Sequence, residues 1–454
     1  MPWKMVSEGR FERPLGETEK LLWLIGASAF AFGKDEWHLF TTARLHLGCE
    51  ALLGDEAVAA LRKAWKSLRF EHPSIAVITD GATLTYDVPD VSSLEQWADK
   101  TFIVDRDTEE AEDVIASIGP CEQAQLHVLP HTRQIVLHTA HWRSDGRGLP
   151  QLLDRLLHFM THPQLSSLRW GEETSRLTIC LEDAANMIDQ VSPADQARVK
   201  EMAGQLLKGS PALTISCIGD TDTQPGSPRR CLLSLTALQT AALISTCRAR
   251  NLTVTAAVHA AIATTNIAHA TLSSKGLDYR SSIRRDLRAR LKEPHNSPAS
   301  AAALFNTATI FSLPADGTWT DFAKHLTDEY RGSYDDEQFR LHRVYYRQLV
   351  ADITHAATES SGTARAADVD ISSIGLVENL LRREYGEGPG LVQVEDMAVS
   401  VNTCSRQAAV FVFTFRDCLN LYMTYNEAFY AREYMKRFLT EIKERLVAEL
   451  GIGD

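Results

Sequence analysis

The sequence predicts an α/β protein, of the α+β type, whose strands and helices alternate within two similar halves. Three observations predict this class. The chain has 454 residues, which is more than one compact core usually holds. Runs whose apolar residues recur at every second position alternate with runs whose apolar residues recur at helical spacing. The two halves also share a similar order of such runs, which indicates a duplicated architecture.

The first half begins with a predicted helix at 17–32 and a predicted strand at 36–47. Apolar residues occupy both alternating sets of positions in that strand, so we expect both of its faces to be covered. Residues 55–68 carry apolar side chains at helical spacing and predict an amphipathic helix. Short strands are expected at 74–79, 83–88 and 125–129, with Asp80-Gly81 as a hairpin turn between the first two.

A strand, a turn and a helix are predicted around His141. Residues 134–141 alternate in the manner of a strand, and Gly146 then interrupts the pattern with a turn. From Leu149 the apolar residues recur at helical spacing, and Pro150 suits the first turn of a helix. We therefore expect His141 at a junction that leads from strand through loop to helix.

A polar stretch at 208–230, with several Gly, Pro and Ser residues, breaks the periodic pattern and predicts a crossover linker. It would separate an N-terminal half, 1–207, from a C-terminal half, 231–454. In the C-terminal half, helices are expected at 236–248, 255–269 and 430–449, and strands at 302–312 and 408–425.

The composition excludes several classes of function. A formal net charge of -12 argues against nucleic acid as the main partner, because phosphate binding needs a basic footprint. The eight cysteines show no pair at the close spacing of a zinc or redox site, so we expect reduced thiols and no metal. The apolar run at 21–32 is too short to span a bilayer and is interpreted as a buried helix. A cytoplasmic protein without a membrane span is predicted.

One local basic patch stands out against the acidic average. It admits two interpretations, a contact to a coenzyme phosphate or a solvated helix face. Its members are Arg280, Arg284, Arg285, Arg288 and Arg290.

The segment from His141 to Gly146 reads His-Trp-Arg-Ser-Asp-Gly and carries residue types suited to acyl transfer. The imidazole of His141 is a candidate general base, since it can accept a proton near neutral pH. Asp145 has two possible roles: to pair with a distant arginine and hold the loop, or to bond the imidazole directly. Because Gly146 allows a sharp bend that turns the carboxylate into the protein, we favour the first role, with Arg44 as the candidate partner.

These residues, and the chain as a whole, resemble the chloramphenicol acetyltransferase-like superfamily, which includes plant BAHD acyltransferases and condensation domains. The segment His141–Gly146 matches its HxxxDG signature, and the strand and helix at 43–68 look like its first strand and helix. Softer resemblances lie at 278–280, 304–307 and 414–425. Residues 169–183 and 253–261 are similar to fungal trichothecene 15-O-acetyltransferases and related fungal alcohol acyltransferases.

The resemblance implies two similar halves, each a mixed β-sheet flanked by helices, with an active-site tunnel at their interface. It implies a monomer that transfers an acyl group, acetyl above all, from acetyl-CoA as co-substrate to a small-molecule alcohol of fungal secondary metabolism, such as a trichothecene-like sesquiterpenoid. His141 would act in a direct ternary-complex mechanism, with no bound cofactor. Residues expected at the substrates are Trp142, Gly146, Tyr279, Asn306, Ser372 and Asn402.

Several alternatives stay open. Trp142 can equally fill core, and the oxyanion candidates Asn306, Asn402 and Ser372 can equally cap a turn or end a strand. Many relatives carry a second histidine where Ala140 stands, and the DFGWG signature of the plant branch has no clear match. A condensation-type enzyme that uses a carrier-protein thioester, or a non-catalytic metabolite-binding relative, would share the same fold.

Overall fold

The computed structural model describes residues 2–48, 53–208, 212–219, 222–332, 334–358 and 367–453. Cys49 and residues 209–211, 220 and 221 of the predicted linker lie outside these ranges. The chain divides into two compact units. Unit 1 consists of Met1–Met187, Asp286–Asn306 and Glu378–Val401, and unit 2 of Ile188–Arg285, Thr307–Val377 and Asn402–Asp454. Two segments of the predicted C-terminal half therefore belong to unit 1, and 188–207 belongs to unit 2.

Unit 1 contains two sheets. The larger has six strands in the order β13-β14-β3-β8-β7-β6, antiparallel except for the parallel pair β6 and β7. The smaller has the order β1-β2-β5-β4. The strands of unit 1 are β1 (Lys4–Ser7), β2 (Arg10–Pro14), β3 (Leu39–Leu47), β4 (Ile78–Thr79), β5 (Thr83–Asp87), β6 (Phe102–Val104), β7 (Gln125–Leu129), β8 (Gln134–Thr139), β13 (Glu384–Tyr385) and β14 (Val392–Val401). Its helices are α1 (Glu17–Ala27), α2 (Asp55–Glu71), α3 (Val91–Thr101), α4 (Ala111–Ser117), α5 (Gly148–Thr161) and α6 (Leu181–Ala184).

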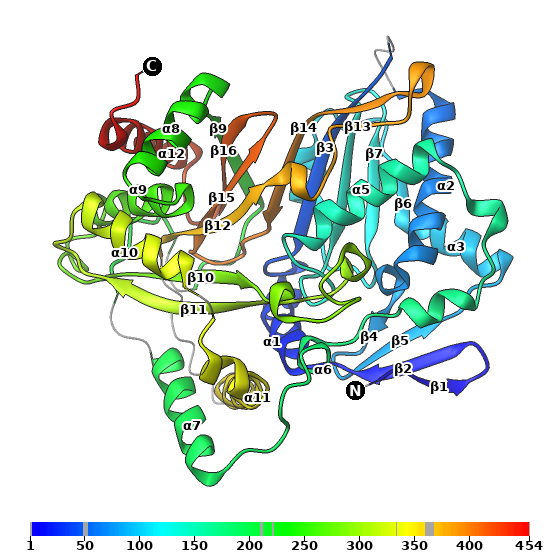
Figure 1. Cartoon of the computed structure of the whole chain (residues 1–454), viewed down its shortest axis with the longest axis horizontal. Coiled ribbons are helices and arrows are strands. Elements are labelled where there is room, and N and C mark those ends of the chain that lie inside the picture. Colours follow the sequence, from blue (N-terminus) through cyan, green and yellow to red (C-terminus); the bar gives the residue numbers. More distant parts are fainter. Residues whose placement is uncertain are drawn as a thin grey trace. The chain divides into compact units, whose positions relative to one another are not determined.

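Strand β3 lies at the centre of the larger sheet, between β8 and β14. Its alternating residues are buried on both faces at Leu39, Phe40 and Thr41, as the sequence predicts. The strand begins later than expected because Trp37 has a positive φ of 64°, which is incompatible with extended backbone. Helix α5 packs against α2 and against β3, β8 and β14, so it covers one face of this sheet (Figure 1).

The predicted hairpin at Asp80-Gly81 is confirmed: β4 and β5 pair antiparallel on either side of it. Gly81 has a φ of 88°, a conformation that glycine adopts without steric cost. The Asp80 carboxylate accepts backbone hydrogen bonds from Ala82 and Thr83, as an aspartate in a turn commonly does. The strand predicted at 74–79 is shorter than expected, because Pro73–Ala76 forms a 3-10 turn with proline at its start.

Unit 2 contains a four-stranded sheet in the order β12-β15-β16-β9 and the two-stranded sheet β10-β11. Helix α9 packs against α10, α12 and β12 (Figure 1). Their apolar side chains form one continuous core. The strands are β9 (Pro228–Ser234), β10 (Tyr279–Asp286), β11 (Asn306–Leu313), β12 (Val369–Leu376), β15 (Ala408–Phe415) and β16 (Cys418–Asn426). The helices are α7 (Pro193–Lys208), α8 (Ala237–Ala249), α9 (Val254–Ala268), α10 (Trp319–Arg331), α11 (Asp336–Thr358) and α12 (Arg432–Leu450).

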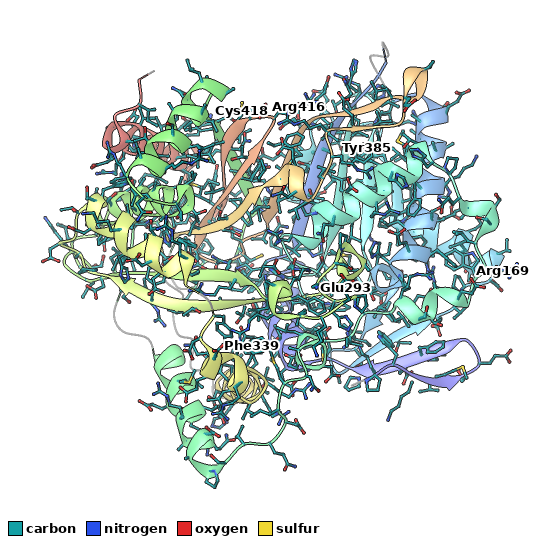
Figure 2. The ribbon with its side chains drawn as sticks, in the orientation of Figure 1. Arg169, Glu293, Phe339, Tyr385, Arg416 and Cys418 are labelled. Atoms are coloured by element: carbon teal, nitrogen blue, oxygen red, sulfur yellow. The ribbon has the colours of Figure 1, made fainter. Side chains whose placement is uncertain are left out.

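The run predicted as strand at 408–425 forms the hairpin of β15 and β16, in which Phe415 pairs with Cys418. Arg416 and Asp417 make the turn, with φ of 49° and 63°. Figure 2 labels Arg416 and Cys418 at this end of the hairpin. Two consecutive positive φ values are typical of the tight hairpin turn that matches strand twist. The predicted helices α8, α9 and α12 are confirmed within a few residues at each end.

Two buried aspartates of unit 2 lie near each other in the chain but differ in their partners. Asp370 accepts hydrogen bonds from Ser281, Ser282 and Arg284. The Asp368 carboxylate accepts one from the Gln407 side chain, at 3.1 Å. Burial, followed by the negative charge of Asp370, raises the pKa of Asp368 to about 7.

We predict that Asp368→Asn removes part of the pH dependence of stability. The folded chain keeps a proton on Asp368 that the unfolded chain releases near its ordinary pKa of 3.8. The free energy of unfolding therefore falls as the pH rises from about 3.8 to about 7. The fall is at most about 1.4 kcal/mol per pH unit. In urea denaturation, the stability of Asp368→Asn relative to wild type should grow over this window and then level off. Parallel pH profiles would contradict the prediction.

Among the described residues, no helix is both long enough and apolar enough to cross a membrane. The cysteines in the described part of the chain are all free of disulfides.

Candidate active site

His141 lies where the sequence predicts it, between a strand and a helix of unit 1. Strand β8 ends at Thr139, a turn follows at His141, and α5 starts at Gly148. The His141 side chain is half-buried. The predicted role as a general base needs access to a reactant, and a half-buried side chain is compatible with it.

Asp145 holds this turn through both of its carboxylate oxygens. Oδ2 accepts from Nη1 of Arg288 at 2.9 Å and from the backbone N–H of Phe305 at 3.0 Å. Oδ1 accepts from the backbone N–H groups of Arg147 at 3.1 Å and Gly148 at 2.9 Å. The last two donors belong to the start of α5, so the carboxylate also serves as the cap of that helix. Asp145 therefore has four donors, one of them a distant arginine, and its loop-holding role stays a prediction.

The ion pair of Asp145 and Arg288 is enclosed by protein, with side chains 1% and 7% exposed. Burial by itself would raise the pKa of Asp145, but the Arg288 charge and the backbone donors outweigh it and hold the pKa below its usual value. Arg288 also pairs with Asp286 at 3.1 Å and donates to the carbonyl of Ala303 at 3.2 Å. The two carboxylates and the carbonyl engage the two terminal nitrogens of a guanidinium that would be costly to bury alone, while its Nε has no hydrogen-bond partner among the described residues.

The predicted partner of Asp145 was wrong. Arg44 lies on β3 with a side chain 35% exposed, and its nearest carboxylate is Glu110, at 4.0 Å. In this part of β3 the buried residues are the alternate positions Ala43 and Leu45, so Arg44 lies on the opposite, partly exposed face of the strand.

Sequence reasoning missed Arg288, although it singled out the patch to which Arg288 belongs. The structure shows the partners of three of these arginines: Arg288 binds Asp145, Arg284 binds Asp370 at 3.2 Å, and Arg285 donates to the Gly332 carbonyl at 2.7 Å. Arg284 and Arg285 lie on strand β10, so the solvated helix face does not describe them, and a contact to a coenzyme phosphate stays a prediction. The requirement that a buried carboxylate has a cationic partner was the usable signal.

The start of α5 approaches another part of unit 1 very closely. The Ser144 hydroxyl donates to the Ala301 carbonyl at 2.8 Å. A Cβ atom at Gly148 would lie 2.1 Å from that same oxygen and 2.5 Å from the Ser144 hydroxyl. Glycine is therefore required at 148, whereas the predicted bend at Gly146 lies in the preceding turn.

We predict that Gly148→Ala lowers the free energy of unfolding by about 1–3 kcal/mol, because the added methyl group overlaps a backbone oxygen. Gly204→Ala in α7 is the matched control, since nothing lies within 4 Å of its Cβ position. Alanine there should be neutral or stabilise the helix by up to about 1 kcal/mol. Urea denaturation of both variants tests this. Equal stability of Gly148→Ala and wild type would contradict the prediction, because the backbone would then shift to make room for the methyl group.

Trp142 is 6% exposed and fills space in unit 1. The guanidinium of Arg143 lies 4.3 Å from the centroid of its ring. Arg143 in turn donates to the carbonyls of Ser74, Val77 and Glu122. These contacts favour the core role among the two that the sequence left open.

The remaining predicted substrate residues have different environments. Tyr279 occupies a core position: it is fully buried in unit 2, and its hydroxyl donates to the Val369 carbonyl at 3.0 Å. The side-chain oxygen of Asn402 accepts from buried Arg230 at 2.6 Å. Ser372 on β12 and Asn306 at the start of β11 are half-buried. Asn306 directly follows Phe305, whose N–H binds Asp145.

Two curated proteins match the whole of this chain, although no family model matches it. Acetyltransferase pigO of Monascus ruber is 34% identical over 457 residues, covering 100% of this chain and 99% of pigO. O-acetyltransferase pigM of Monascus ruber is 27% identical over 463 residues, covering 100% of this chain and 88% of pigM.

Among solved structures, TRI3 trichothecene 15-O-acetyltransferase from Fusarium sporotrichioides superposes with a TM-score of 0.82 at 19% identity, covering 98% of this chain and 97% of TRI3. That likeness confirms the fold that the HxxxDG segment and its surroundings predict. Because pigO matches along the whole chain, this protein belongs to the family of fungal acetyltransferases that includes pigO, and it has the chloramphenicol acetyltransferase-like fold.

Proposed function

We propose that this enzyme transfers an acetyl group from acetyl-CoA to a hydroxyl of a fungal secondary metabolite, with His141 as the general base. The observation that carries the proposal is the fully engaged Asp145 carboxylate, whose four donors hold the turn from which the half-buried His141 extends. The names of pigO and pigM as acetyltransferases, one of them an O-acetyltransferase, support the acetyl group and the alcohol.

In the proposed mechanism, His141 accepts the hydroxyl proton while the alcohol oxygen attacks the thioester carbonyl. The tetrahedral intermediate then collapses with cleavage of the carbon–sulfur bond, and the proton passes from His141 to the departing thiolate. The products are the acetate ester and free CoA thiol, so atoms and charge balance. General acid–base catalysis of this kind contributes about 10²–10⁴-fold to a rate.

The intermediate needs a hydrogen-bond donor at its oxyanion. We propose Asn306 for this role, ahead of Asn402 and Ser372, because it is half-buried and directly follows a residue that binds Asp145. The backbone next to Asn306 is therefore held by the same carboxylate that holds the His141 turn.

The experiment that tests the function is release of free CoA thiol by the purified enzyme from acetyl-CoA and a panel of alcohols. The panel contains hydroxylated polyketides and sesquiterpenoids, including trichothecene-type alcohols, and each ester product is identified by mass spectrometry. Alcohol-dependent thiol release is the expected result. Activity with an acyl carrier protein thioester, and none with acetyl-CoA, would instead establish the condensation-type alternative. Binding of an alcohol without turnover of either donor would establish the non-catalytic one.

A further inference from the structure

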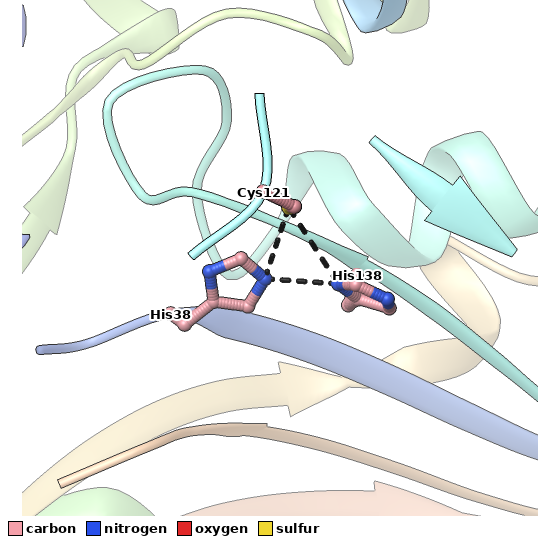
Figure 3. Close-up of side chains that lie close together, drawn as sticks. All are labelled: His38, Cys121 and His138. Atoms are coloured by element: carbon pink, nitrogen blue, oxygen red, sulfur yellow. Dashed lines mark hydrogen bonds between the residues drawn. The ribbon is translucent and has the colours of Figure 1, made fainter. Parts of the chain in front are cut away.

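Three potential metal ligands from distant parts of the sequence converge in unit 1, apart from the Asp145 network. His38 lies just before β3, His138 lies on the neighbouring strand β8, and Cys121 lies in the segment before β7 (Figure 3). Nε2 of His38 is 2.9 Å from Nδ1 of His138. Sγ of Cys121 is 3.7 Å from the first nitrogen and 3.9 Å from the second. One ligand atom of each residue therefore points at a common centre.

We propose that His38, Cys121 and His138 bind a zinc ion. A tetrahedral zinc ion has Zn–N bonds of about 2.0–2.1 Å and Zn–S bonds of about 2.3 Å, which places two nitrogens about 3.3 Å apart and nitrogen and sulfur about 3.6 Å apart. All three observed separations lie within about 0.4 Å of these values. Imidazole and thiolate are also the ligand types that zinc prefers.

An outer carboxylate orients the first ligand. Nδ1 of His38 lies 2.8 Å from Oδ2 of Asp35, and both side chains are buried, at 1% and 5% exposure. When this N–H donates to the carboxylate, Nε2 is the nitrogen that faces the cluster with its lone pair. A carboxylate behind a ligating histidine is the usual arrangement at zinc sites. The Asp35 carboxylate and a Cys121 thiolate together also balance the charge of a divalent ion.

His138 is fully buried and its polar contacts are on the cluster side. Within the described residues, its other nitrogen, Nε2, is buried without a hydrogen-bond partner. Around the ring are Phe40, with a stacked ring centroid at 5.6 Å, and His127, with a centroid at 5.1 Å. Burying an imidazole costs free energy when neither nitrogen has a partner, so this ring needs the contact that its Nδ1 makes in the cluster.

A hydrogen bond between the two histidines would explain their short contact but not the place of Cys121. One proton between His38 and His138 satisfies both facing nitrogens. The Cys121 thiol has one proton to donate, so a hydrogen bond would bring its sulfur closer to one acceptor than to the other. The sulfur instead lies at nearly equal distances from both nitrogens. A sulfur almost equally far from both nitrogens fits a shared central ion. Other His, Cys, Asp or Glu groups in the described chain do not reach this centre as a fourth ligand, which leaves one tetrahedral position for water.

The location suggests what the ion would do. His138 precedes His141 by three residues on the strand that leads into the His141 turn. Cys121 is followed by Glu122, whose carbonyl accepts from Arg143 at 2.7 Å. The ion would thus join three separate segments immediately before the turn and position it. This role for the ion does not depend on the identity of the acyl donor or acceptor.

The test uses the full-length protein, without an affinity tag, stripped of metal with a chelator and titrated with Co²⁺ and then with Zn²⁺. A bound thiolate gives Co²⁺ an intense near-ultraviolet charge-transfer band, and tetrahedral geometry gives strong visible bands. We expect both to saturate at about one equivalent of Co²⁺ and to disappear when Zn²⁺ displaces it. We also expect Zn²⁺ to raise the melting temperature, because it binds the folded chain preferentially.

Cys121→Ser is expected to abolish the charge-transfer band and the thermal shift. The matched controls are Cys418→Ser, which removes another half-buried thiol, and His127→Gln, which removes a neighbouring imidazole that is not a ligand. Both should bind like wild type. Absence of the band in wild-type protein would overturn the proposal whatever the folding of the variants. So would a band that survives Cys121→Ser, because the ion would then bind elsewhere.

Discussion

Replacing His141 by alanine is expected to lower the rate of acetyl transfer by about 10²–10⁴-fold, because the attacking alcohol loses its base. If the base acts in the transition state, kcat and kcat/KM should fall together while KM changes little. The side chain is half-buried, so its removal should leave the unfolding transition unchanged. Initial rates of thiol release, measured beside urea denaturation of the same preparation, test both statements.

His131→Ala is the matched control for this variant. His131 is an exposed histidine in the turn that connects β7 to β8, on the same hairpin that leads to His141. Its removal should alter neither the rate nor the stability. Wild-type rates in His141→Ala would remove His141 from the mechanism. A rate loss of the same size in His131→Ala would point to a general disturbance of the hairpin.

The second large effect is expected at Asp145. In Asp145→Asn the guanidinium of Arg288 loses its buried counter-charge, and breaking such a pair costs about 3–5 kcal/mol of folding free energy. We expect a value near the lower end, because Asp286 stays 3.1 Å from Arg288. Activity should fall as well, since the amide nitrogen that replaces Oδ2 cannot accept from Arg288 or from the Phe305 N–H, and the turn that carries His141 loses these two contacts. Urea denaturation measures the first effect and thiol release the second.

Asp99→Asn makes the same chemical change at an exposed ion pair. Asp99 is 69% exposed and pairs with Arg62 on the surface of unit 1, so its loss should cost no more than about 1 kcal/mol. The contrast between the two variants isolates the contribution of burial. An Asp145→Asn protein that unfolds like wild type but is inactive would favour the direct role of Asp145 on the imidazole over the structural one.

The local elements around the site follow from short stretches of sequence. The turn between β8 and α5 was predictable because alternation stops after Thr139 and helical spacing starts at Leu149. The burial of β3 on both faces was predicted from its alternation, but it holds only at Leu39, Phe40 and Thr41, because Thr42, Arg44 and His46 on the second face are partly exposed. The family resemblance added the role of His141, which no periodicity could supply.

Other features depend on pairings between residues far apart in the sequence. Asp145 and Arg288 are separated by 143 positions, and several arginines were equally eligible on charge alone. His38 and His138 are separated by 100 positions, so no spacing rule for metal ligands would connect them. Strand β14 enters the sheet of unit 1 beside β3 although it comes from the far end of the chain.

The sequence by itself therefore determined the type of the main elements that it predicted, the junction that carries His141 and the family. These depend on backbone geometry and on neighbours a few residues away, which are written directly in the order of side chains. The tertiary structure decided the partner of Asp145, the core position of Tyr279 and the convergence of His38, Cys121 and His138. Which distant groups meet depends on how the whole core packs, and the interaction of any one pair is too small to specify it in advance.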